Sequence, residues 1–474
     1  MPIFRLRRMM CSACHVGAVA VLFAPAVLAA QRTDATRALE REVFKQLVEI
    51  NTSDSAGHTR EAAEAMAKRL VAAGMPVKDV QVLGFASKYQ NLVARFRGRN
   101  ASAKPILLIA HLDVVDARKE DWSFDPYTFR EQDGYYYGRG TMDDKFGAAL
   151  LVASFIRFRQ ENFVPDRDII LALTADEETT GQSIQWLVEE RRALVDAEFA
   201  LNADAGGGEI KDGKDLSFTV QTAEKVYLSF QLEVRNKGGH SSLPEPDNAI
   251  YHLSDGLGRL SKHTFPMRLN ETTRAYFEGK ANTQPAQIAA DMRAVARTSD
   301  AAAARRLSAV PFYNSGMRTT CIATRLFAGH ADNALPQVAR ATVNCRMLPS
   351  DPADSVEATL KRIVADTAIH FSRIDPVTPS PASPLRREVL APVEQLVKAM
   401  WPGAVIVPEM STGATDGAYT RNAGIPTYGV AAVFEKIDDD RSHGKDERIR
   451  VKSYHEAAEF WYQLVKLLTS RTGA

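Results

Sequence analysis

Four apolar runs in this chain each lead to a residue that binds divalent metal ions well. They are 106–109 before His111, 169–173 before Glu177 and Glu178, 199–201 before Asp204, and 425–433 upstream of His443. Continuous apolar runs are typical of strands that are buried on both faces of a parallel sheet. In open α/β sheets, functional groups collect just beyond the carboxyl ends of such strands. The pattern therefore predicts an α/β fold in which these side chains converge on one metal-binding crevice.

The first thirty residues have the features of an export signal. Three arginines precede an apolar stretch from Val16 to Val27, and small residues follow at Ala29 and Ala30. The stretch is shorter than the roughly 20 residues of a membrane span, and polar residues come after it. We therefore expect residues 1–30 to be a signal peptide and the mature protein, without a membrane span, to be periplasmic or secreted. An uncleaved anchor is the alternative.

Charge and cysteine content exclude several classes of protein. Loss of the signal removes three arginines, so 59 basic and 58 acidic residues become 56 and 58, a net charge of −2. With no basic tract that could follow a phosphate backbone, nucleic acid is excluded as a partner. Outside the signal only Cys321 and Cys345 remain, which excludes a thiolate zinc cage and a disulfide-rich scaffold. These two cysteines form either one bridge or two buried thiols.

The order of predicted elements divides the mature chain, which is too long for one small domain. Strand and helix patterns alternate over 31–223 and resume over 378–474, as in an α/β domain with a mostly parallel sheet. Residues 224–377 instead have the order βαββαβ, with strands at 227–234, 319–327, 341–347 and 369–374 and helices at 249–260 and 356–364. That order predicts an inserted, ferredoxin-like α+β domain with a small antiparallel sheet. The stretch 264–317, rich in Ala and Arg, is expected to be helical.

His111 and Asp113 stand two residues apart in an extended segment, so their side chains leave the same face. A carboxylate in that position can hold the second nitrogen of a metal-bound imidazole and thereby orient the ring. The alternative is a turn aspartate beside an ordinary buried histidine.

A glycine-punctuated turn from Gly138 to Lys145 opens onto an apolar helix and contains Asp143 and Asp144. The positive end of a helix favours carboxylates at its N-terminus, so either aspartate could be a helix cap. Two of them in one turn suggest that one supports the turn while the other binds metal.

Glu177 and Glu178 are like charges at the end of an apolar strand, a crowding that is unfavourable unless a cation is present. Neighbouring strand residues face opposite ways, so one could bind metal while the other accepts a proton from water. A solvated acidic loop is the alternative. Together, two histidines and three carboxylates fit two divalent ions better than one closed tetrahedral zinc.

At this point the motifs match a known family. The chain resembles the co-catalytic dizinc metallopeptidases and amidohydrolases, which include glutamate carboxypeptidase, aminoacylase, succinyl-diaminopimelate desuccinylase, peptidase T and carboxypeptidase S. The motifs that carry the resemblance span the mature chain: His111-Leu112-Asp113, Gly138-Arg139-Gly140, Asp143-Asp144-Lys145, Glu177-Glu178 with Gly181, Asp204, Gly239-His240-Ser241-Ser242, Asn333-Ala334-Leu335-Pro336, Thr415-Asp416-Gly417 and His443-Gly444.

The resemblance implies two divalent ions, zinc or else Co²⁺ or Mn²⁺, with Asp143 as the ligand shared by both. One ion would add His111 and Asp204, and the other Glu178 and His443. It further implies that Glu177 is the general base, that Asp113 supports the metal-bound imidazole, and that Asp144 is not a ligand.

The same resemblance implies that residues 224–377 form a lid and dimerisation domain, and hence a homodimer. Its His240 would polarise the scissile carbonyl, commonly in the neighbouring subunit, and Asn333 and Arg346 would hold the free carboxylate of the substrate. The segment Ser411-Thr412-Gly413 would line the same pocket. Outside this context, His240 would be a surface histidine, Arg346 a strand-edge salt bridge and Asn333 a turn residue.

One departure from the family pattern concerns specificity. The arginine that often follows Thr-Asp-Ala is missing from Thr415-Asp416-Gly417-Ala418, and Arg421 is a possible replacement. We expect an exopeptidase that cleaves the amide next to a free C-terminal carboxylate in dipeptides or short peptides. The enzymatic alternative is an N-acyl-amino-acid amidohydrolase, and the non-enzymatic one is a metal-dependent binding module.

Overall fold

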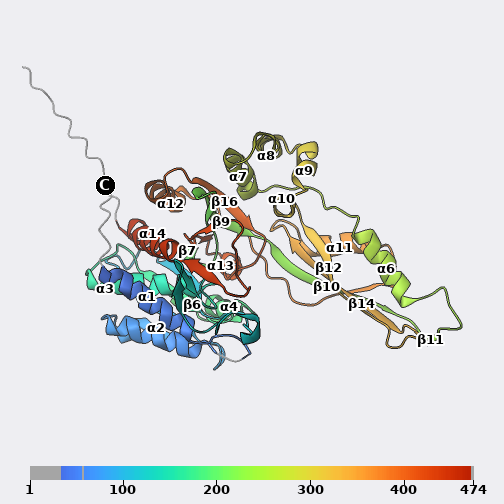
Figure 1. Cartoon of the computed structure of the whole chain (residues 1–474), viewed down its shortest axis with the longest axis horizontal. Helices are drawn as coiled ribbons and strands as arrows, with labels where there is room; N and C mark the ends of the chain where they lie inside the picture. Colours follow the sequence, from blue (N-terminus) through green and yellow to red (C-terminus); the bar gives the residue numbers. More distant parts are fainter. Residues whose placement is uncertain (1–33, 56–57, 471–474) are drawn as a thin grey trace, which may run out of the picture.

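The computed structural model describes residues 34–55 and 58–470 (Figure 1). The predicted signal peptide, residues 1–30, lies outside the described residues. None of the helices in the described ranges is both long enough and apolar enough to cross a membrane.

A large mixed sheet forms the centre of one half of the molecule. Its order is β1-β2-β6-β3-β7-β17-β9-β8-β18, and β16 also pairs with β9. The strands are β1 Val80–Leu83, β2 Asn91–Phe96, β3 Ile106–His111, β6 Ile169–Thr174, β7 Phe199–Asn202, β8 Gly207–Lys211, β9 Lys214–Glu224, β16 Val405–Ser411, β17 Thr427–Gly429 and β18 Phe434–Lys436. The central strands β6, β3, β7 and β17 are parallel, which confirms the predicted mostly parallel α/β architecture.

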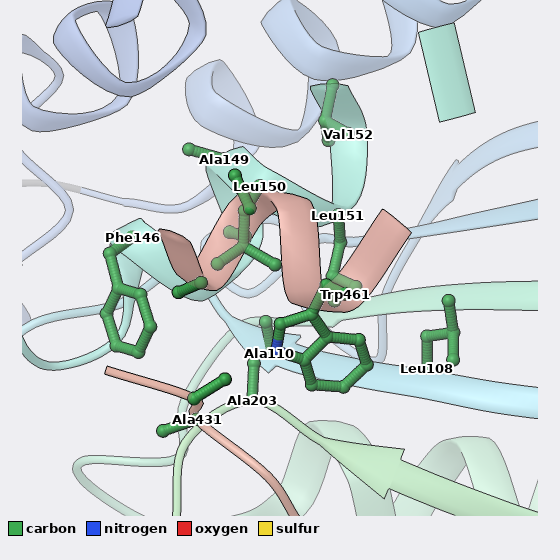
Figure 2. Packing of buried hydrophobic residues seen from close by; sticks show 14 of the residues in the cluster. Leu108, Ala110, Phe146, Ala149, Leu150, Leu151, Val152, Ala203, Ala431 and Trp461 are labelled. Carbon is green, nitrogen blue, oxygen red and sulfur yellow. The ribbon is translucent and has the colours of Figure 1, made fainter. Parts of the chain in front are cut away.

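Helices cover both faces of this sheet, so its central strands are buried on both sides. One face carries α1 Asp34–Glu49, α2 Arg60–Ala72, α3 Lys145–Gln160, α12 Arg387–Met400 and α14 Val451–Thr469. The other face carries α4 Gln182–Glu190, α5 Arg192–Val195 and α13 Gly417–Asn422. Helix α3 is apolar on all sides because α14 covers its outer surface, and Figure 2 shows Leu150 and Leu151 of α3 beside Trp461 of α14.

A second sheet with the order β12-β14-β10-β15 lies in the other half of the molecule (Figure 1). Its strands β10 Val226–Arg235, β12 Thr320–Ala328, β14 Val338–Met347 and β15 His370–Arg373 pair antiparallel. Helices α6 Ala249–Leu260 and α11 Ala353–Val364 share one apolar cluster with the sheet. This βαββαβ order and pairing confirm the predicted ferredoxin-like arrangement.

A disulfide joins the two cysteines whose state the sequence left open. Cys321 of β12 and Cys345 of β14 are directly opposite partners in the antiparallel register, and their sulfur atoms are bonded. The bridge therefore ties the edge strand β12 to the sheet.

The stretch between α6 and β12 is helical, as predicted. It contains α7 Glu271–Lys280, α8 Ala286–Thr298, α9 Ala301–Leu307 and α10 Pro311–Met317. Phe277, Met292 and Val295 form an apolar cluster that includes Val407 of β16. These helices therefore cover the β16 side of the large sheet.

A small three-stranded sheet brings two distant loops together. It has the order β19-β5-β4, made of β19 Arg448–Arg450, β5 Tyr135–Tyr137 and β4 Arg130–Gln132. The antiparallel pairing of β19 with β5 puts the segment before Arg448 beside the segment after Tyr137. Those two segments contain His443 and Asp143.

Candidate metal centre

The carboxyl ends of three adjacent parallel strands position most of the predicted ligands. Strand β3 pairs with both β6 and β7 and ends at His111. Glu177 and Glu178 follow β6 by a few residues, and Asp204 follows β7 by two. These side chains meet because parallel strands end at the same edge of a sheet.

All five side chains predicted to bind metal meet in one cluster. Asp143 lies between the two histidines, with Oδ1 2.9 Å from His111 Nε2 and Oδ2 3.0 Å from His443 Nε2. His111 Nε2 is also 3.7 Å from Asp204 Oδ1, and His443 Nε2 is 3.1 Å from Glu178 Oε2. The cluster thus has two halves that share Asp143.

Asp144 also lies within reach of this cluster. His111, Asp144 and Asp204 offer ligand atoms within 4.8 Å of one another, as do His111, Asp143 and Glu178. The buried carboxylate of Asp144 accepts the backbone N–H of His111 through Oδ2, at 3.3 Å, and its Oδ1 has no partner among the described residues. Asp143 is nevertheless the acid that contacts both histidines.

Asp113 contacts the His111 imidazole through its backbone carbonyl and its carboxylate. The nearest oxygen to His111 Nδ1 is the Asp113 backbone carbonyl, at 3.0 Å, with the carboxylate farther away at 3.5 Å. A carbonyl accepts, so Nδ1 carries the proton and the neutral ring presents the Nε2 lone pair to a metal. The Asp113 carboxylate also accepts the backbone N–H groups of Glu177 and Glu178, at 3.2 and 2.9 Å.

The crowding of acids perturbs the pKa values across the cluster. Burial, with the charge of Asp204 as the next cause, raises the pKa of Glu177 well above its usual range. Burial raises the pKa of Asp204 to about 7, and hydrogen bonds to Asp143 and Glu178 raise the pKa of His443 to about 10. The buried Glu178 Oε1 has no partner among the described residues. Excess carboxylates and an orphaned oxygen fit divalent cations, which stabilise ionised ligands.

A buried ion pair that the sequence analysis missed connects the two halves of the cluster. Glu447 accepts from Arg139 Nη1 at 2.5 Å and from the backbone N–H groups of Met142 and Asp143 at 2.6 and 3.3 Å. Arg139 Nη2 donates to the carbonyl of His443 at 3.3 Å. The pair therefore holds the Asp143 turn against the His443 loop. The available signal was an arginine between two glycines, at Gly138-Arg139-Gly140.

Asp176, which precedes the two glutamates, has a structural role. Its carboxylate accepts the backbone N–H groups of Gln182 and Ser183 at 3.0 and 2.8 Å, at the start of α4. It thus stabilises the N-terminus of that helix.

His240 and Asn333 lie together but away from the metal cluster. His240 belongs to the short strand β11 Gly239–His240, which pairs with β13 Ala334–Leu335. Asn333 accepts the backbone N–H of Ser241 at 3.0 Å, and both His240 and Asn333 are exposed. In Figure 1, β11 lies at the end of the small sheet that is farthest from the large sheet. Within one chain, therefore, neither His240 nor Asn333 reaches the metal ligands.

Arg346 and Ser411 come together at the junction of the two sheets. Lys225, between β9 and β10, donates its backbone N–H to the Ser411 carbonyl at 3.0 Å and its Nζ to the Arg346 carbonyl at 3.1 Å. The half-buried Arg346 guanidinium lies over the Tyr227 ring at 4.7 Å, and no carboxylate pairs with it among the described residues. Thr412 and Gly413 continue from Ser411 toward α13.

Arg421 does not replace the missing motif arginine. It is buried and forms an ion pair with Glu224, with Nη2 2.7 Å from Oε2, and it donates to the carbonyl of Thr427 at 3.1 Å. All of these partners are interior groups, so Arg421 stabilises the fold.

The chain is similar in sequence to known proteins. The human N-fatty-acyl-amino acid synthase/hydrolase PM20D1 is 29% identical over 382 residues, which cover 78% of this chain and 75% of the relative. The Probable carboxypeptidase S-like 2 of Dictyostelium discoideum is 28% identical over 389 residues, covering 79% and 74%.

Among solved structures, the M20 family metallo-carboxypeptidase Sso-CP2 from Sulfolobus solfataricus superposes with a TM-score of 0.68 at 15% identity. The superposition covers 90% of this chain and 99% of that one, and it shows a shared fold. The family described as Peptidase family M20/M25/M40 matches residues 107–467. The chain therefore belongs to the M20 family of metal-binding hydrolases, which includes peptidases, carboxypeptidases and amidohydrolases.

Proposed function

We propose that this hydrolase cleaves the amide bond next to the free C-terminal carboxylate of dipeptides or short peptides, with two bound zinc ions. The observation that carries the proposal is Asp143, whose two oxygens lie 2.9 and 3.0 Å from one histidine of each half-site. His111, Asp143 and Asp204 would hold one ion, and Asp143, Glu178 and His443 the other. Co²⁺ and Mn²⁺ suit the same ligands.

Bound there, a pair of divalent ions would supply Lewis acidity and would lower the pKa of water to about 7. Glu177 is buried beside the cluster, and the raised pKa of its carboxyl suits a group that must take up a proton. It accepts the proton of the attacking water and returns it to the leaving amine. Asp113 holds the Glu177 backbone in place.

Arg346 supports recognition of a free carboxylate. Its guanidinium lies at the junction of the two sheets without an acidic partner among the described residues, and a planar guanidinium binds a carboxylate through two hydrogen bonds. Ser411, Thr412 and Gly413 would line the same pocket, and Asn333 would bind the carboxylate from the neighbouring subunit, together with His240.

An N-acyl-amino-acid amidohydrolase is the second candidate, because it would use the same metal cluster and the same carboxylate pocket. The relative named N-fatty-acyl-amino acid synthase/hydrolase, at 29% identity, favours it. The two candidates differ only in the group on the other side of the scissile amide.

One substrate panel separates these candidates. The zinc-loaded protein is assayed for kcat/KM on dipeptides, on N-acyl amino acids, and on both with the carboxylate amidated. Peptidase function predicts preference for the dipeptides and loss of activity on amidation. Preference for N-acyl amino acids would establish the second candidate instead, and turnover of neither class would remove both. Arg346→Gln should raise KM for the carboxylate substrates, whereas Arg340→Gln, on the exposed part of the same strand, should not.

We further propose that residues 224–377 act as a lid and dimerisation domain. Strand β12 is an edge strand with exposed Leu326 and Phe327, each 59% exposed, and a partner would cover both. A homodimer would also give His240 a site to act on, in the neighbouring subunit, where it would stabilise the oxyanion.

Subunit mixing tests this arrangement. Glu177→Gln and His240→Ala are each expected to be inactive as homodimers. If His240 acts in the neighbouring subunit, a mixed dimer regains one complete site, so about a quarter of wild-type activity returns on mixing. Recovery should be absent if His240 acts within its own chain, and a monomer in light scattering would refute the dimer.

Export is proposed from the N-terminal residues alone. N-terminal sequencing of the protein from the producing cell should start near residue 31. A mature protein that begins at Met1 would refute the signal peptide.

A further inference from the structure

A cavity of about 410 Å³ lies in the small-sheet half of the molecule, apart from the metal cluster. It opens to the surface and is lined by the end of α6, the segment 261–265, α10 and the first residues of β12. Leu257, Leu260, Phe265, Ile322 and Ala323 contribute apolar walls. A volume in this range is typical of sites for small organic ligands.

One charged side chain, Arg318, lines this apolar cavity. It is only 8% exposed. Its Nη1 donates to Asn314 Oδ1 at 2.9 Å and to Ser308 Oγ at 3.3 Å, and both acceptors are neutral. Its Nε is buried with no partner in residues 34–55 and 58–470. Nη2 makes no hydrogen bond or ion pair within the described ranges, and it is not among the fully buried atoms, so it keeps donors that nothing in the described protein uses.

No acidic side chain of the described chain compensates the charge of Arg318. Burial alone lowers its pKa, with no carboxylate acting in the other direction. The acid on the adjoining segment, Asp351, accepts from Arg268 at 2.8 Å and from Thr319 at 2.6 Å, so it is already engaged.

A charge in this setting calls for an anion. The guanidinium group stays protonated in proteins, so Arg318 cannot become neutral as a buried lysine can. A buried charge without a counter-charge costs several kcal/mol. An uncharged side-chain amide could donate to Asn314 and Ser308 equally well. These two hydrogen bonds therefore do not explain why the residue is a cation.

A second polar side chain, His263, also lines the cavity. His263 Nε2 is buried without a partner among the described residues, and burial lowers the pKa of this imidazole. The ring packs edge-on against Phe265 of the same cavity, with ring centroids 4.9 Å apart.

We propose that this cavity is a second ligand site, for a small carboxylate that carries an aliphatic chain. Arg318 binds the carboxylate through Nη2, and Leu257, Leu260 and Phe265 contact the chain. A free fatty acid and an N-acylated amino acid share this chemistry. The inference does not depend on the proposed reaction, because the cavity shares no residue with the metal cluster.

Calorimetric titration of the full, zinc-loaded chain tests the site, with octanoate and N-octanoylglycine as probes and octanol as the uncharged control. Arg318→Gln should weaken one binding event at least tenfold, or about 1.4 kcal/mol, and Arg305→Gln, at an exposed position of α9, should not change it. Arg318 also joins α9 to α10, so its replacement could disturb the fold. A second variant is therefore placed at Ile322, which is 67% exposed. Ile322→Glu should produce the same loss by placing a carboxylate at the cavity, and Ile322→Gln should not.

The tighter of the two probes identifies the source of the ligand. Binding at the catalytic cluster is unaffected by these substitutions and remains as a separate event. The site is refuted if both Arg318→Gln and Ile322→Glu keep every saturable binding event of the wild-type protein. It is also refuted if octanol binds as tightly as octanoate.

Discussion

Replacement of Glu447 by glutamine should weaken metal binding although Glu447 touches no metal ligand side chain. Its carboxylate accepts from Arg139 and from the backbone N–H groups of Gly140, Met142 and Asp143, at 2.5, 3.2, 2.6 and 3.3 Å. Through Arg139 the same pair holds the carbonyls of His443 and Gly444. Glu447 and Arg139 are 0% and 2% exposed, so water cannot replace a lost contact.

The magnitude follows from the number of donors that lose an acceptor. Glutamine offers one carbonyl oxygen in place of two charged ones, and its NH₂ group faces N–H donors. Breaking a buried ion pair costs about 3–5 kcal/mol because the remaining charge is left uncompensated. Part of that cost falls on folding. The loosened turn and loop should weaken metal affinity about 10–100-fold, the usual effect of changing an outer partner of a metal site.

The assay is competition for zinc against a chromophoric chelator at equilibrium. Glu131→Gln is the matched control, because Glu131 of strand β4 makes an exposed ion pair with Arg41 of helix α1. We expect the control to bind zinc within about twofold of wild type, an exposed pair contributing at most about 1 kcal/mol to stability. Unchanged zinc affinity in a folded Glu447→Gln protein would refute the argument that this buried pair positions the ligands.

Three further predictions concern catalysis, pH and the disulfide. Glu177→Gln should retain its metal content and lose about 10²–10⁴-fold in kcat, the usual contribution of a general base; full activity would exclude the assignment. Burial raises the pKa of Glu435 to about 8 in the folded protein. Since the folded value exceeds the unfolded one, stability should fall as pH rises from about 5 to 8. Glu435→Gln should reduce that fall in urea titrations at both pH values, and an equal fall would refute the shift. Reduction of the Cys321–Cys345 bridge, which spans 24 residues, should lower the free energy of unfolding by about 3 kcal/mol, because the bridge restricts the unfolded chain. An unchanged free energy of unfolding would refute that restriction.

The convergence of the metal ligands could be predicted from sequence for a simple physical reason. His111, Glu178 and Asp204 each follow a continuous apolar run, and parallel strands buried on both faces align their carboxyl ends. The run 425–433 was also expected to lead to His443, but it ends ten residues earlier, so the run alone did not fix the position of this side chain. The structure brings it in through the pairing of β19 with β5.

The contacts that escaped prediction depend on pairings between distant segments. Arg139 and Glu447 are 308 residues apart, and no periodicity links them. The disulfide required the register of β12 against β14, because a shift of one residue would place the two cysteines on opposite faces. Arg421 was misjudged because its partner, Glu224, belongs to a strand almost two hundred residues earlier in the chain.

The most direct test of the account is a zinc-soaked crystal measured at the zinc absorption edge. We expect two anomalous peaks in each chain, with His111 and Asp204 beside one, Glu178 and His443 beside the other, and the Asp143 carboxylate between them. A single peak, or a pair of ions that Asp143 does not contact, would contradict the shared metal centre on which the proposed chemistry rests.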